Sequence, residues 1–140
     1  MSAVRTTQAN PRMLTLASDP SNISKVEPYA EQIANQYQLD PEKRINLLIS
    51  LTEAVTNAII HGNQQDRSKM VKVQCACKQS SLAIRVSDQG RGFNYESLPD
   101  PTSPERILEC GGRGVYLMHQ LCDNLRFRNN GSTVEMHFRV

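Results

Sequence analysis

Hydrophobic and polar positions follow a helical period between residues 41 and 61 of the chain. The apolar members recur at spacings of three and four: Ile45, Leu48, Leu51, Val55 and Ile59. Asp40 supplies an N-cap oxygen in front of Pro41, and Gly62 offers a C-terminal stop. The pattern therefore predicts a helix from about Pro41 to His61 with a buried apolar stripe.

A second stripe along the same helix is polar. Its members are Asn46, Ser50, Glu53 and Asn57. Residues four apart lie one above the other on a helix, so Glu53 and Asn57 project side by side. Taken alone, E-x-x-x-N also fits the solvated face of an amphipathic helix, and a function for the pair needs further signals.

Strands are predicted where apolar and polar residues alternate with a period of two. They lie at residues 12–18, 70–79, 81–88, 124–128 and 133–140. The polar turn QSS predicts an antiparallel hairpin between the second and third strands. Asn130-Gly131 predicts another hairpin between the last two, because this dipeptide suits the left-handed backbone of a tight turn.

Two more helices and a long loop complete the pattern. Residues 24–38 have a helical period, and Ser24 and Glu27 have the spacing of a capping box. Residues 94–110 contain three prolines and predict a long loop, and residues 114–124 predict the last helix. The inward positions of that helix are Val115, Met118, Leu121 and Cys122.

These elements predict an α+β fold, a two-layer sandwich with helices packed on one face of a mixed, mostly antiparallel sheet. With 140 residues, the chain is long enough for one domain with a real core. We expect that domain to span residues 11–140 and residues 1–10 to be a flexible N-terminus.

Composition narrows the class of protein. We predict no nucleic-acid binding, because the net charge is only +2, Trp is absent and no basic cluster is interleaved with aromatics. No secretory signal and no run of about 18 apolar residues is present, so we expect a cytoplasmic protein without a membrane span. Cys75 and Cys77 share a predicted strand face, no C-x-x-C occurs and the histidines are scattered, which favours reduced structural thiols over a metal site.

The stretch VSDQGRGFN begins at the end of a predicted strand. Asp88 lies just inside the strand end, and Gly90 and Gly92 follow at alternate positions. Glycines so spaced let the backbone turn sharply and approach a ligand closely, and Asp88 can accept a hydrogen bond from a base edge. By itself, D-x-G-x-G also fits a plain turn.

The stretch GGRGVYLM leads from glycines directly into a predicted helix. Such a helix start can bind phosphate, because its backbone N–H groups are free and the positive end of the helix dipole lies there. Alone, the stretch equally fits a glycine-rich helix start. The strand, G-x-G-x-x-G and helix of a Rossmann unit are absent, as is the Walker A lysine motif.

The three stretches in this order resemble the ATP-binding fold shared by gyrase, histidine kinases and the heat-shock and mismatch-repair ATPases (the GHKL or Bergerat fold). Within that superfamily the chain resembles the anti-sigma-factor serine kinases. LTEAVTNAIIHGN matches the N box of the family, VSDQGRGF its first glycine box, GGRGVYLMHQLCD its second and NNGSTVEMHF its closing hairpin. The resemblance covers nearly the whole chain.

This resemblance implies ATP and Mg²⁺ as cofactors and assigns roles to the polar residues. Glu53 would be the base that orients the attacking hydroxyl. Asn57 would help to hold the Mg²⁺ that bridges the phosphates, and Asp88 would accept the adenine amino group. The remaining binding residues would be Gly112, Arg113 and Gly114 around the phosphates, and Gly90, Gly92 and Thr133 near the adenine. Residues 94–110 would be the mobile lid over the nucleotide.

The resemblance further implies protein-serine kinase activity on an anti-anti-sigma (STAS-type) protein, with a sigma factor as a possible second partner and a homodimer as the expected assembly. A histidine kinase is disfavoured, because Ile60 stands where that branch typically has a lysine and only about forty residues precede the helix. The chain also has no room for the transducer domains of the gyrase-like ATPases. Two alternatives stay open: a nucleotide-gated module that sequesters its partner without phosphotransfer, and a partner-switching pathway that involves no sigma factor.

Overall fold

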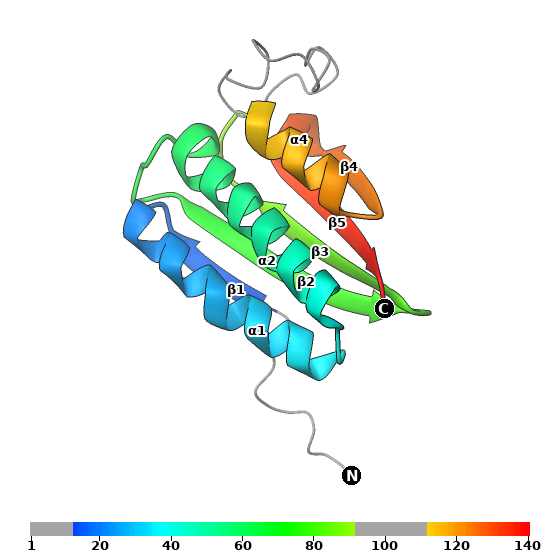
Figure 1. The fold of residues 1–140 in the computed structure, drawn as a ribbon. Coiled ribbons are helices and arrows are strands. Elements are labelled where there is room, and N and C mark those ends of the chain that lie inside the picture. Colours follow the sequence, from blue (N-terminus) through cyan, green and yellow to red (C-terminus); the bar gives the residue numbers. More distant parts are fainter. Residues whose placement is uncertain (1–12, 92–111) are drawn as a thin grey trace.

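The computed structural model describes residues 13–91 and 112–140, and for Gly112 and Arg113 only the backbone. The predicted loop at 94–110 and the N-terminal residues 1–10 lie outside this part. Two layers are formed, with three α-helices covering one face of a five-stranded sheet (Figure 1). The elements are β1 (Met13–Ala17), η2 (Pro20–Lys25), α1 (Val26–Gln36), α2 (Pro41–Thr56), η3 (Asn57–Gly62), β2 (Met70–Lys78), β3 (Ser81–Ser87), α4 (Gly112–Leu121), β4 (Asn124–Arg128), η5 (Asn129–Gly131) and β5 (Thr133–Arg139). The predicted α+β sandwich is confirmed.

The sheet has the strand order β1-β2-β3-β5-β4. Within the described residues every strand pairing is antiparallel, so the sheet is more regular than the predicted mixed one. Both predicted hairpins are present. Gln79 and Ser80 turn with φ of 52° and 66°, and Asn130 and Gly131 turn with φ of 59° and 92°, the left-handed conformations that such short connections require.

The core lies between the helices and the covered face of the sheet. Alternate residues on β2, β3 and β5 point into it: Val71, Val73, Cys75, Leu82, Ile84, Val86, Val134, Met136 and Phe138. The helices contribute, among others, Val26, Ile33, Leu47, Leu51, Val55, Ile59, Val115 and Met118. No helix in the described part of the chain is long and apolar enough to cross a membrane.

Helix α2 packs differently from its predicted stripes. Ile45 was expected to be buried, but it is 58% exposed, whereas Leu47 and Ala54 are buried. Ser50, from the polar stripe, is fully buried, and the Cys122 thiol donates to its hydroxyl over 3.9 Å. The reason is that α4 lies beside α2 (Figure 1), with Gly114 against Glu53 and Asn57 of the polar stripe, so the buried sector of α2 is turned toward α4. Burial raises the pKa of the Cys122 thiol to about 12, which keeps it protonated and unreactive, as expected of a structural cysteine.

The predicted capping box at the start of α1 does not form. The N-cap residue is Lys25, which makes no capping side-chain bond, and the Ser24 hydroxyl donates to the Ser21 carbonyl over 3.0 Å instead. The 3₁₀ segment η2 runs directly into α1, so Ser24 already lies in a helical turn and cannot act as its cap.

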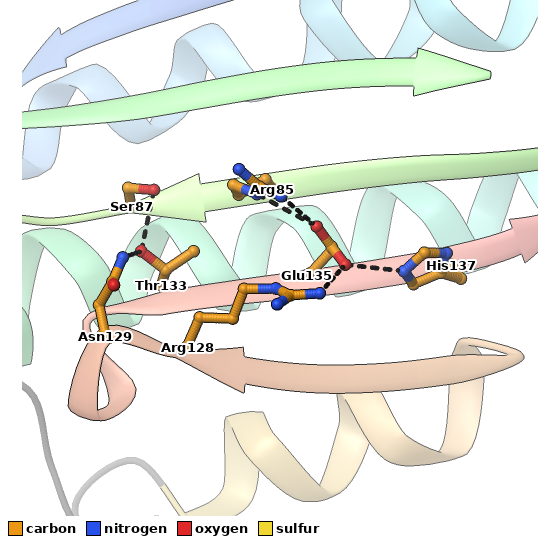
Figure 2. Close-up of polar contacts among 7 residues, drawn as sticks. All are labelled: Arg85, Ser87, Arg128, Asn129, Thr133, Glu135 and His137. Atoms are coloured by element: carbon orange, nitrogen blue, oxygen red, sulfur yellow. Dashed lines mark hydrogen bonds and ion pairs between the residues drawn. The ribbon is translucent and has the colours of Figure 1, made fainter. Parts of the chain in front are cut away.

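The uncovered face of the sheet contains a buried carboxylate, Glu135 on β5, whose side chain is 9% exposed (Figure 2). Arg85 donates to it through Nη2 over 2.7 Å, Arg128 through Nη2 over 3.3 Å, and His137 lies at 3.0 Å. Burial opposes ionisation of Glu135, but these hydrogen bonds outweigh it and lower the pKa of the carboxyl to about 2.

We expect this cluster to make folding stability depend on acid pH. A carboxyl whose pKa is lower in the folded than in the unfolded chain stabilises the protein above its unfolded pKa, and that stabilisation is lost as the pH falls toward the folded pKa. Glu135→Gln should therefore lower the free energy of unfolding by about 3 kcal/mol at pH 7, and the difference from wild type should shrink between about pH 4.5 and pH 2. Urea unfolding across this range measures it, and a difference that does not change with pH would contradict the assignment.

Candidate functional site

The predicted polar pair lies where α2 changes its winding. The α-helix continues through Thr56, and the N–H of Asn57 still bonds to the carbonyls of Glu53 and Ala54. Because the winding is regular up to this point, Glu53 and Asn57 point to the same side, as their spacing predicted. From Asn57 to Gly62 the chain is π-helical, and a single π-helical turn inside or after an α-helix is frequent at functional sites.

The glycine-rich start of α4 lies directly against this pair. A Cβ added at Gly114 would lie 2.8 Å from Asn57 Nδ2 and 3.0 Å from Glu53 Oε1, so any larger residue would displace them. The first N–H groups of a helix have no partner within it. The fold thus brings the first turn of α4, opened by Gly112 and Arg113, to the two polar side chains that the sequence singled out.

Glu53 and Asn57 are half-buried, yet neither side chain has a hydrogen bond or ion pair with another described residue. Among the described residues, therefore, nothing occupies the carboxylate and the amide that lie against Gly114. No group of three or more His, Cys, Asp or Glu side chains within residues 13–91 and 112–140 could hold a metal ion by itself. Any cation here would therefore keep much of its coordination shell from water or a bound ligand.

Asp88 lies at the opposite end of η3, immediately after β3. Its N–H donates to the Ser132 carbonyl over 2.9 Å, and its Oδ1 accepts the Gly90 N–H over 2.8 Å. Burial raises the pKa of Asp88, opposed by the Gly90 N–H and the charge of Lys69. The carboxylate is thus partly removed from water and can accept a further donor.

Two glycines allow the close packing around Asp88. A Cβ at Gly62 would overlap the Asp88 carboxylate, and a Cβ at Gly90 would overlap the Gly62 carbonyl. Gly62, predicted as a helix stop, therefore serves chiefly to let η3 approach the Asp88 loop. Segment η3 thus connects the two halves of the site, with Asn57 facing Gly114 at its start and Gly62 facing Asp88 at its end.

Thr133 is not brought to the side of the sheet that carries Asp88. It pairs with Ser87, and its hydroxyl bonds to Ser87 Oγ and Asn129 Nδ2, each over 3.1 Å (Figure 2). Alternation along β5 places Thr133 beside Glu135 on the uncovered face, whereas the buried Val134 points toward the helices. Gly92 and the Arg113 side chain lie outside the described residues.

One polar residue of the site was missed by sequence reasoning. Asn63 follows η3 and is 1% exposed, and its Oδ1 accepts the Gln89 N–H over 2.8 Å. The only signal in the sequence was an amide directly after the glycine that ends the predicted helix, and such a position is more often a turn than a buried contact.

Comparison with known proteins identifies the class of protein. Residues 16–138 match the family described as Histidine kinase-like ATPase domain. This match defines the class of protein as a histidine kinase-like ATPase domain.

Similar proteins with assigned names indicate which branch of this class the chain belongs to. The chain is 36% identical over 108 residues to an anti-sigma F factor of Clostridium perfringens, covering 71% of this chain and 76% of that protein. It is 32% identical over 98 residues to the serine-protein kinase RsbW of Bacillus subtilis, covering 65% of this chain and 61% of that protein. The chain belongs to the family of anti-sigma-factor serine kinases, as its motifs predicted.

A solved structure supports the fold. The crystal structure of the RsbU and RsbW domains of a Mycobacterium tuberculosis protein superimposes with a TM-score of 0.66 at 17% identity, covering 91% of this chain and 31% of that one. At this identity the likeness concerns the fold alone, and it confirms the two-layer architecture.

Proposed function

We propose that this chain is an ATP-dependent protein-serine kinase and anti-sigma factor of a bacterial partner-switching system. The observation that carries the proposal is the pair Glu53 and Asn57, which lie against the glycine-rich first turn of α4 and bond to no other described residue. A carboxylate, an amide oxygen and free helix N–H groups are the components that phosphoryl transfer from a nucleotide needs.

The site residues fit ATP and Mg²⁺. The amide oxygen of Asn57 is a hard ligand suited to Mg²⁺, which keeps several waters and takes few protein ligands. When bound, the metal neutralises charge on the phosphates. The N–H groups of Gly112, Arg113 and Gly114 would hold the phosphates, and only a glycine at position 114 leaves the pair undisturbed.

Glu53 would orient the attacking serine hydroxyl and accept its proton. It lies one helical turn before Asn57, so base and metal ligand face the same space. Because Glu53 has no partner among the described residues, its carboxylate is available for this role. The γ-phosphoryl group then passes from ATP to the serine oxygen, and ADP is released.

Asp88 would recognise the base, with Gly90 and Gly92 allowing the close approach of the backbone. The neighbouring Ser132 carbonyl and the Gly90 N–H fix the backbone and carboxylate of Asp88. In this proposal Thr133 supports the site from the other face of the sheet, through Ser87.

The partners follow from the family. We propose an anti-anti-sigma (STAS-type) protein as the phosphate acceptor, a sigma factor as the second partner, and a homodimer as the assembly. The clostridial relative is named for a sigma factor and the Bacillus relative for serine-kinase activity. Phosphorylation of the acceptor serine would end its association with the kinase, since added charge at an interface disrupts contacts formed by the neutral hydroxyl.

A second candidate function is a nucleotide-gated binding module that sequesters its partner without transfer. The position of Glu53 favours the kinase, because a pure binder has no evident use for a carboxylate beside the metal ligand. The purified chain, mixed with ATP, Mg²⁺ and a candidate STAS protein, should produce phosphoserine on that protein. Stable complex formation without phosphoserine would instead support the binding module.

Base choice gives a separate prediction. GTP presents a carbonyl oxygen where ATP presents its amino group, so Asp88 would face an acceptor. An unsatisfied buried polar group costs roughly 1 to 3 kcal/mol, so ATP should bind at least about tenfold more tightly than GTP. Asp88→Asn should bind ATP more weakly and discriminate less, because an amide can offer either a donor or an acceptor.

Titration of fluorescent ATP and GTP analogues into both proteins measures this preference, with the melting temperature as the control for folding. If Asp88 only caps the turn into Gly90, Asp88→Asn will lower stability and leave selectivity unchanged. That outcome would remove Asp88 from the base site.

A further inference from the structure

Asn63 is the most completely bonded polar side chain near the site. It is 1% exposed, and both ends of its amide are engaged. Nδ2 donates to Ser18 Oγ over 2.8 Å and to the Met70 carbonyl over 3.1 Å, while Oδ1 accepts the Gln89 N–H over 2.8 Å. One side chain thus joins the end of β1, the start of β2 and the loop after β3.

Asn63 binds the backbone of the loop that carries Asp88, and the Gln89 side chain of that loop also accepts the Met70 N–H. Three successive N–H groups of the loop each have one acceptor. Asp88 N–H donates to the Ser132 carbonyl, Gln89 N–H to Asn63 Oδ1 and Gly90 N–H to the Asp88 carboxylate. The Ser132 carbonyl lies just before β5, and the Asp88 carboxylate belongs to the loop itself. Of these three hydrogen bonds, only the one to Asn63 therefore connects the loop to the end of η3.

The tie lies next to the closest packing in the site. Asn63 directly follows Gly62, whose Cα faces the Asp88 carboxylate with no room for a side chain. The N–H of Asn63 bonds to the Ala58 carbonyl over 2.8 Å, which closes the π-helical turn. Movement of Asn63 would therefore change both the end of η3 and the Asp88 loop.

We infer that Asn63 is a positioning residue for base recognition, and that it sets the preference for ATP over GTP by fixing the Asp88 loop against η3. This inference rests on the proposed role of Asp88. Selectivity between bases requires the carboxylate to be held in place, because a loop free to shift could relieve the acceptor-to-acceptor contact with GTP.

Ser18 provides the matched control. It is also fully buried, its hydroxyl donates to the Lys69 carbonyl over 2.6 Å, and it accepts from Asn63. Ser18→Ala removes buried hydrogen bonds of the same network and leaves the Gln89 N–H bonded to Asn63. Asn63→Ala removes the acceptor of Gln89 as well.

The experiment compares wild type, Asn63→Ala and Ser18→Ala as full chains, below the lowest of their melting temperatures. In titrations with ATP and GTP analogues, Asn63→Ala should bind ATP about tenfold more weakly and lose most of its preference for ATP. Ser18→Ala should lose stability but keep the wild-type ratio of the two affinities. Binding to Asn63→Ala should remain Mg²⁺-dependent, since Asn57 is untouched.

Hydrogen exchange supplies a readout that needs no nucleotide. The Gln89 amide should exchange faster in Asn63→Ala than in Ser18→Ala, relative to the global stability of each variant. Should Asn63→Ala fail to fold, Asn63→Ser takes its place: its short hydroxyl adds no buried charge and does not reach as far as the amide oxygen that accepts the Gln89 N–H, so exchange should again be fast and base selectivity low.

An unchanged affinity ratio in folded Asn63→Ala would overturn the inference. An equal loss of selectivity in Ser18→Ala would do the same, as would wild-type exchange and selectivity in Asn63→Ser. A wild-type chain that does not prefer ATP overturns the proposed base recognition and the selectivity role with it. Faster Gln89 exchange in Asn63→Ala would still support the positioning of the loop, so the two failures are distinguishable.

Discussion

Replacing Glu53 by alanine is expected to reduce phosphotransfer by about 10²- to 10⁴-fold while ATP affinity barely changes. A positioned general base contributes a factor of this size to the chemical step and little to ground-state binding. Because Glu53 has no hydrogen bond or ion pair with another residue in the described part of the chain, its removal should also leave the fold intact. Single-turnover transfer to a STAS-type acceptor, alongside nucleotide titration, separates the two quantities.

Glu53→Gln is the matched variant, because it keeps the size of the side chain beside Gly114 and removes only the base. It should be as defective in transfer as the alanine variant. Transfer at the wild-type rate in either variant would show that Glu53 is not the base. Partner binding without transfer in the wild type would favour the nucleotide-gated module.

Replacing Asn57 by alanine is expected to abolish Mg²⁺-dependent nucleotide binding and phosphotransfer together. Phosphoryl transfer relies on the metal to neutralise charge that builds on the phosphates, and no cluster of acidic or histidine ligands in residues 13–91 and 112–140 could replace an amide that is lost. Asn57→Ala should therefore lose nucleotide binding and phosphotransfer together, whereas Glu53→Ala should lose only phosphotransfer. Nucleotide titration with and without Mg²⁺ measures the first loss and phosphoserine formation the second.

Asn46→Ala is the control for the Asn57 variant. It makes the same chemical change on the same helix, eleven positions earlier, roughly 16 Å along the axis. It should bind nucleotide and transfer phosphate like the wild type. Equal ATP affinity of the wild type with and without Mg²⁺ would contradict the assignment of Asn57 to the metal.

Periodicity and turn chemistry in the sequence were sufficient for most of the architecture. The bounds of the long helix, both hairpins and the side-by-side placement of Glu53 and Asn57 depend on local geometry, which residue spacing encodes directly. The order of the three motifs indicated the family, and the comparisons confirm it. The predictions of the helix, the hairpins and the polar pair held because each concerns residues close together in the chain.

The sequence was a poorer guide to which face of a helix or strand is covered by a neighbouring element. Ile45 and Ser50 exchange their expected environments because α4, more than sixty residues later in the chain, covers the polar stripe of α2. Thr133 pairs with Ser87, and alternation along β5 places it on the uncovered face, so its place near the adenine stays a prediction.

By itself, then, the sequence determined the elements, the fold class and the polar pair of the candidate site. Only the tertiary structure decided what lies against that pair, why Gly62 must be a glycine, and that Asn63 ties η3 to the Asp88 loop. The physical reason is that spacing along a chain determines directions within one element, whereas close approach and buried hydrogen bonds are properties of two elements packed together.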